Sequence, residues 1–132
     1  MSQASVIDLR GLNPAPVTPF TRNGAVDYPA IQRLGRWLAS VSGVKSLTVL
    51  GHAGEGTFLE RDEQLKVIEA FRESVGDRIP IIAGITLEGT KVAAEEARRA
   101  MKAGASAGLV YPSHGWLRFG YQKGAAQDRY KA

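Results

Sequence analysis

The sequence predicts an α/β protein of about four βα units, the N-terminal half of a (β/α)8 barrel. Short apolar runs rich in branched residues alternate with longer segments of helical period. These runs lack a polar side, as is typical of a parallel sheet buried by helices. Residues 42–49 also resemble residues 103–110, with two βα units between them. Each unit is therefore about 30 residues long, and eight units would need about 250 residues, the size of a (β/α)8 barrel. Four units can also form a small open parallel sheet, and periodicity alone does not decide between the two.

The first predicted strand covers residues 15–18, and a helix follows it. Asp27 is a residue type that caps helices, and Pro29 is tolerated in a first turn. The apolar residues of this helix recur at helical spacing: Ile31, Leu34, Leu38 and Val41. Gly43 is expected to end the helix, and Trp37 within it is interpreted as a packing residue.

The second predicted strand covers residues 46–50. Acidic residues 60, 62 and 63 favour the N-terminus of the next helix. Its apolar stripe consists of Leu65, Ile68, Phe71 and Val75. Gly76 is expected to end it.

The last two units follow the same pattern. A third strand is predicted at residues 80–84, followed by a helix with Thr90 as its cap. The small and apolar residues of that helix are Ala93, Ala97, Ala100 and Met101. A fourth strand is predicted at residues 107–111. A fourth helix is expected to begin near Arg118 and to run to the end of the chain, cut short.

Length and composition suit one partial domain over residues 1–132, in which residues 1–10 form an N-terminal extension. There is no cysteine, which excludes a disulfide framework, a thiolate metal site and a cysteine nucleophile. The chain begins with a polar stretch, and no apolar run approaches the length of a membrane span, so we expect a cytoplasmic protein without a membrane partner. The net charge is +4, but most basic residues sit beside acidic ones. That pattern is typical of solvated helix faces, so we expect no nucleic-acid partner.

Active sites of parallel α/β folds lie at the carboxyl ends of the strands. The loop after the second strand is the most informative, because Gly51 and Gly54 flank His52 and Ala53. Glycines let backbone N–H groups approach a ligand, so the loop can bind a carboxylate or phosphate. It can equally be a tight turn that needs glycine for its dihedral angles. Thr18 ends the first strand and faces the same edge.

Two histidines, His52 and His114, also fall on strand-end loops. Either can serve as a general base or a metal ligand, although a lone histidine is more often a hydrogen-bonded structural residue. Two histidines without a carboxylate at fixed spacing are a weak signal for metal, so neither a metal nor a cofactor is expected. Trp116, in the loop after the fourth strand, is a plausible wall for a substrate.

Several spaced motifs resemble the dihydrodipicolinate synthase / N-acetylneuraminate lyase family from about Gly11 onward. Residues 16–20 and 23–27 are similar to its opening strand and first helix cap, and residues 49–55 resemble its Gly-Thr-Thr-Gly-Glu signature. Residues 78–84 and 103–112 resemble its third and fourth strands. The resemblance implies a (β/α)8 barrel, commonly in homotetramers. It also implies a lyase that adds a pyruvate-type 2-keto acid to an aldehyde, cleaves the product or dehydrates it.

The family's chemistry proceeds through a lysine Schiff base on the sixth strand, with a proton-relay tyrosine on the fifth. Both positions are expected beyond Ala132, so the chain is interpreted as a truncated and inactive family member. The alternative is a non-catalytic half-barrel module that assembles with itself or with a complementary half.

The resemblance implies that Gly51, His52, Ala53, Gly54 and Thr18 bind a substrate carboxylate. His52 and Ala53 stand where the family has two threonines, and Ser113 and His114 stand where it has two tyrosines. These departures favour a dehydratase or aldolase of a 2-keto acid other than the one that dihydrodipicolinate synthase uses.

Overall fold

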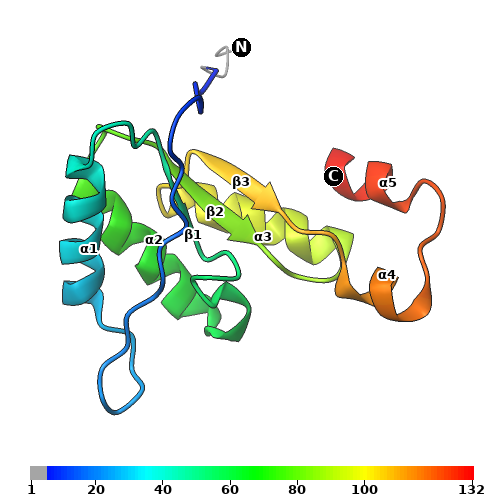
Figure 1. The fold of residues 1–132 in the computed structure, drawn as a ribbon. Coiled ribbons are helices and arrows are strands. Elements are labelled where there is room, and N and C mark those ends of the chain that lie inside the picture. Colours follow the sequence, from blue (N-terminus) through cyan, green and yellow to red (C-terminus); the bar gives the residue numbers. More distant parts are fainter. Residues whose placement is uncertain (1–5) are drawn as a thin grey trace.

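The computed structural model describes residues 6–132. Residues 1–5, part of the expected N-terminal extension, lie outside the described residues. In chain order the elements are α1 (Tyr28–Ser40), β1 (Leu47–Val49), the 3-10 helix η1 (Gly56–Phe58), α2 (Arg61–Val75), β2 (Ile81–Ile85), α3 (Thr90–Lys102), β3 (Ala107–Val110), α4 (His114–Phe119) and α5 (Ala125–Lys131) (Figure 1).

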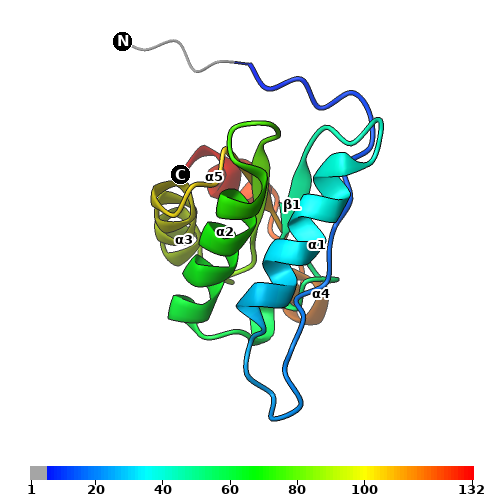
Figure 2. The same cartoon turned by 90° about the vertical axis from the view of Figure 1, so that its left-hand side faces the viewer.

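The three strands form one parallel sheet in the order β1-β2-β3. Leu47 pairs with Ile81, and Ile82 pairs with Ala107. Helices α1, α2 and α3 lie side by side over one face of this sheet (Figure 2). Every residue of the central strand β2 is buried. The predicted α/β fold with parallel βα order is therefore confirmed.

The expected strand at residues 15–18 is wrong, because this segment forms no ladder. The chain nevertheless runs beside β1, where Leu12 forms a parallel bridge with Val44 and the Pro14 carbonyl accepts from the Thr48 N–H at 2.9 Å. Prolines stand at positions 14, 16 and 19 and have no N–H to donate. The segment can therefore accept hydrogen bonds from β1 but cannot complete a regular strand.

The cap of α1 is confirmed, since the Asp27 Oδ1 accepts from the Ala30 N–H at 2.9 Å. The helix ends at Ser40 rather than at Gly43, because Val41 is already extended. The interpretation of Trp37 as a packing residue is wrong. Its side chain is 61% exposed, because it projects from the side of α1 opposite to the buried residues.

The following two helices begin and end close to the expected positions. Glu60 and Glu63 form a reciprocal capping box at the start of α2, and Gly76 ends the helix with a positive φ of 58°. Thr90 is the first residue of α3 rather than its cap, and Gly89 takes the cap position. The apolar residues of these helices pack on the sheet around the fully buried Phe71.

The single fourth helix expected from Arg118 is wrong. Two short helices, α4 and α5, occupy this region, and the chain between them contains Gly120 and Gly124 with φ values of 92° and 96°. Glycine adopts this left-handed region readily, so these two positions break the helix. Within residues 6–132, no helix is both long and apolar enough to cross a bilayer.

Candidate functional site

The turn after β1 carries unusual backbone geometry. Leu50 and Glu55 flank it, and both have positive φ values, 58° and 54°, although neither is glycine. Each such residue costs on the order of 1–3 kcal/mol and persists only where the surroundings impose it. Backbone strain of this kind is frequent at functional sites. It therefore favours the interpretation of the turn as a binding site over its interpretation as a simple connection.

The turn is also closely packed against its neighbours. A Cβ atom on Gly84 of β2 would lie 2.3 Å from the Leu50 carbonyl oxygen, and one on Gly56 would lie 2.1 Å from it. These two glycines therefore let the Leu50 carbonyl sit between β2 and η1. The buried Thr18 hydroxyl donates to the Gly54 carbonyl at 2.6 Å and ties the turn to the N-terminal segment. Thr18 thus supports the predicted binding turn through this hydrogen bond.

Three successive backbone N–H groups of the turn are unpaired within residues 6–132, and two of them belong to the exposed residues His52 and Ala53, whereas Gly54 is buried. The Glu55 N–H donates to the His52 carbonyl and the Gly56 N–H to the Gly51 carbonyl. Within the described residues, the N–H groups of His52, Ala53 and Gly54 donate to no acceptor. Side chains at positions 52 and 53 are exposed. Consecutive free N–H groups beside a strand end form an anion-binding concavity.

The two histidines, far apart in the sequence, meet at this edge of the sheet. The His52 ring stacks on Tyr111, which directly follows β3, with centroids 4.4 Å apart and planes tilted by 31°. The ring centroids of His52 and His114 are 6.1 Å apart. Parallel strands bring their carboxyl ends to one edge, and this is why loops after β1 and β3 come together.

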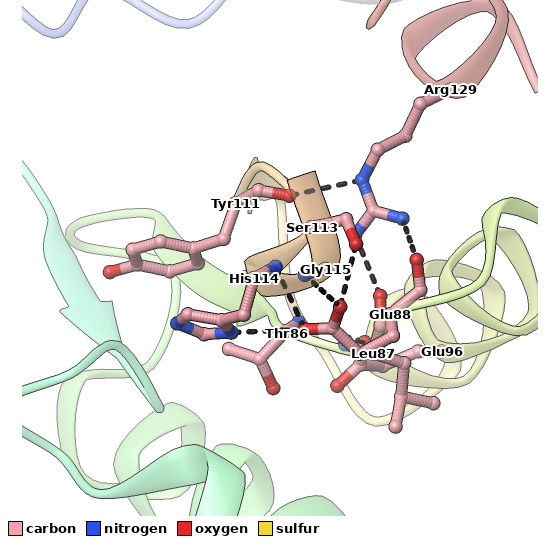
Figure 3. Close-up of polar contacts among 9 residues, drawn as sticks. All are labelled: Thr86, Leu87, Glu88, Glu96, Tyr111, Ser113, His114, Gly115 and Arg129. Carbon is pink, nitrogen blue, oxygen red and sulfur yellow. Dashed lines mark hydrogen bonds and ion pairs between the residues drawn. The ribbon is translucent and has the colours of Figure 1, made fainter. Parts of the chain in front are cut away.

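Glu88, in the loop after β2, organises the start of α4 (Figure 3). Its Oε2 accepts from the Ser113 hydroxyl at 2.6 Å and from the Gly115 N–H at 3.0 Å. Its Oε1 accepts from the His114 N–H at 3.0 Å and lies 2.9 Å from the His114 Nδ1. The Ser113 hydrogen bond, followed by that of the Gly115 N–H, lowers the pKa of Glu88 to about 2. The carboxylate is therefore ionised at neutral pH and fixes the orientation of the imidazole.

Two further charged groups hold the loops of β2 and β3 in place. The Glu96 carboxylate of α3 accepts from the Thr86 and Leu87 N–H groups at 2.9 and 3.0 Å. Arg129 of α5 is only 5% exposed. Its guanidinium donates to the carbonyls of Tyr111, Glu88 and Leu87, which joins the two loops (Figure 3).

Sequence reasoning missed Glu88, Glu96 and Arg129. Glu88 follows β2 by three residues at the carboxyl edge, so its charge and position were a usable signal. Nothing in the sequence pattern indicated that Arg129 would be buried, because it lies in a basic C-terminal segment of the kind that is usually exposed to solvent. Trp116 packs edge-on against Tyr121 with centroids 5.3 Å apart, so its role as a substrate wall stays a prediction.

Comparison with known proteins places this arrangement in one family. The sequence model of the Dihydrodipicolinate synthetase family matches residues 8–114. The chain belongs to the dihydrodipicolinate synthetase family. The match ends at His114, so most of α4 and all of α5 lie beyond it.

Individual family members agree with this assignment. The 4-hydroxy-tetrahydrodipicolinate synthase of Haloarcula marismortui is 39% identical over 106 residues, which is 80% of this chain and 34% of the relative. That of Bradyrhizobium diazoefficiens is 41% identical over 107 residues, covering 81% and 36%. The chain thus spans about a third of the length of the curated relatives that it matches.

Solved structures show the same fold. A chloride-inhibited dihydrodipicolinate synthase from Acinetobacter baumannii, complexed with pyruvate, superimposes with a TM-score of 0.75 at 32% identity over 80% of this chain and 36% of that one. A dihydrodipicolinate synthase family protein from Coccidioides immitis gives 0.74 at 33% identity, over 78% and 34%. The parallel sheet and its helices are therefore the N-terminal part of a (β/α)8 barrel.

Proposed function

We propose that this chain carries the carboxylate-binding part of a site for a pyruvate-type 2-keto acid, in a lyase that works through a lysine Schiff base. The three free N–H groups of the turn after β1 carry this proposal. They point to a ligand with a carboxylate, and the strained backbone on either side holds them in place before the ligand arrives.

The chain's own lysines do not suit the nucleophile. A Schiff-base lysine needs a lowered pKa, which burial or a neighbouring charge provides. All six lysines are exposed, and they are Lys45, Lys66, Lys91, Lys102, Lys123 and Lys131. Lys45 moreover precedes β1, at the edge of the sheet opposite to the turn. We therefore expect this chain alone to bind the acid without forming a covalent adduct.

Binding is tested by titrating the ¹⁵N-labelled chain with pyruvate and following its amide signals. The proposal expects saturable shifts centred on Gly51, His52, Ala53 and Gly54. Thr18→Val keeps the side-chain size but removes the hydroxyl that holds Gly54, so it should weaken binding. Ser40→Ala, at the far end of α1, serves as the control. Shifts spread over the basic surface, or equal shifts with acetate and chloride, would contradict a 2-keto acid site.

Chemistry is tested separately by borohydride reduction in the presence of pyruvate, followed by mass spectrometry. We expect no trapped adduct on this chain. A stoichiometric adduct on one lysine would refute the assignment of the nucleophile to a position outside the chain, while leaving the binding proposal intact.

The free edge of β3 supports an assembly partner that continues the sheet. Among the described residues, β3 pairs only with β2, and Leu109 remains 44% exposed. We propose that a further strand covers this edge, supplied by a complementary half-barrel or by a second copy of the chain. A soluble monomer in light scattering at micromolar concentration would exclude the second copy. If the β3 amides become protected from hydrogen exchange when the chain is mixed with a complementary half-barrel, that result would support the complementary half as the partner.

A further inference from the structure

We propose that His52 and His114 form a binding site for a divalent transition metal such as zinc. Glu88 orients the His114 ring in this site. The chain contains two histidines and no cysteine, so these rings are its only imidazole or thiolate ligands. The fold brings them from different βα loops to a centroid separation of 6.1 Å. Imidazole nitrogen suits zinc, copper and nickel better than magnesium or calcium.

Glu88 gives one ring the orientation that a metal ligand needs. The His114 Nδ1 lies 2.9 Å from the Glu88 Oε1, and a carboxylate oxygen accepts hydrogen bonds, so Nδ1 is the donor in this contact. The other ring nitrogen, Nε2, points away from Glu88 and is the one that can bind a metal (Figure 3). A carboxylate behind the imidazole is the usual second partner of a metal-bound histidine, since it fixes the tautomer and raises the ligand's basicity.

The spacing of the rings is close to what a shared ion requires. With nitrogen–zinc distances of about 2.1 Å, two ligating imidazoles have centroids about 5–6 Å apart. The observed 6.1 Å needs only a small approach. The His114 side chain is 56% exposed and His52 is also exposed, so an ion can reach both rings from solution. Glu88 holds the His114 ring, so the approach must come from His52, which leaves part of its stacking on Tyr111.

The remaining coordination positions would be filled from solution. Within residues 6–132, no group of three or more histidine, cysteine, aspartate or glutamate side chains is arranged around a metal. Water or a small oxygen-containing chelator would therefore complete the site. Two protein ligands are fewer than the three of a catalytic zinc site or the four of a structural one, so two of the four positions are left to solvent.

The test is isothermal titration of the untagged chain with zinc ion alone at neutral pH, supported by the imidazole ¹⁵N signals. We expect one saturable zinc site and shifts of the metal-facing nitrogen of both rings. H52A and H114A should each abolish it, and the double variant should lose no more than either single one. E88Q should weaken binding about 10- to 100-fold, as removal of such an outer partner usually does.

Ser40→Ala is the control. It removes an exposed hydroxyl that donates to the Trp37 carbonyl in α1, away from both histidines, so zinc affinity should be unchanged. Circular dichroism of each variant shows that the fold persists. Absence of saturable binding overturns the proposal. Binding that survives the loss of either histidine also overturns it, because the ligands must then lie elsewhere.

Discussion

Replacing Gly84 with alanine is expected to displace the turn after β1 while the helices keep their positions. The new Cβ would lie 2.3 Å from the Leu50 carbonyl oxygen, 2.7 Å from its carbon and 2.9 Å from the Gly51 nitrogen. All three are backbone atoms, so no side chain can rotate away to make room. Observed Cβ contacts stay beyond 3.0 Å, and the two backbones must therefore separate by at least 0.7 Å.

The energetic cost follows from where this shift occurs. Both β2 and Leu50 are buried, so the displacement strains a packed core, which typically costs about 1–3 kcal/mol. For a small protein this lowers the midpoint of urea unfolding by roughly 1 M. The shift also moves the free N–H groups of His52, Ala53 and Gly54. The free energy of pyruvate binding should therefore become less favourable even under conditions in which the variant remains fully folded.

Urea unfolding, amide chemical shifts and pyruvate titration measure these effects, with Gly115→Ala as the control. A Cβ on Gly115 meets only the Ser113 Oγ at 3.3 Å and the Glu88 Oε2 at 3.6 Å. Alanine in a helix is favoured over glycine by up to about 1 kcal/mol, and the tight 3.3 Å contact with the Ser113 Oγ offsets part of this gain, so this variant should be close to neutral. If Gly84→Ala were as stable as this control, with unmoved amide signals at Leu50 and Gly51, the argument from close packing would be refuted.

Three further predictions concern the charged groups that hold the loops. Arg129→Ala leaves its three carbonyl partners without that donor, so hydrogen exchange in α5 should accelerate; unchanged protection would show that α5 is held by other contacts. Glu96→Ala leaves the Thr86 and Leu87 N–H groups without their acceptor and should cost about 1–3 kcal/mol in urea unfolding, whereas the exposed neighbour Glu95→Ala should change little. The pKa of Glu88 is lowered from 4.5 to about 2, so its stabilising effect is complete above pH 4.5 and is lost as the pH falls toward 2. The Gly115 amide signal should follow that loss, and Glu88→Gln should remove this pH dependence.

Much of this protein was determined by local sequence. The period of apolar residues predicted α1 to α3 and the three parallel strands, because burial of one helix face and both strand faces leaves a repeating pattern. Gly76 marked the end of α2, whereas α1 ended before Gly43. The spaced motifs predicted the family, and the strand-end rule predicted that His52 and His114 would lie at one edge. Where local rules conflicted, prediction failed. Prolines removed the first strand's donors, and two glycines divided the last helix.

Tertiary structure alone decided the contacts between residues distant in sequence. The pattern placed Glu88, His114 and Arg129 in loops and tail, but their pairing depends on where those loops meet. The close approach of the Leu50 carbonyl to β2 likewise exists only because the fold brings Gly84 against it. Hydrogen bonds and close packing act over a few ångströms in space, and such distances are set by the fold of the whole chain rather than by neighbours in the sequence.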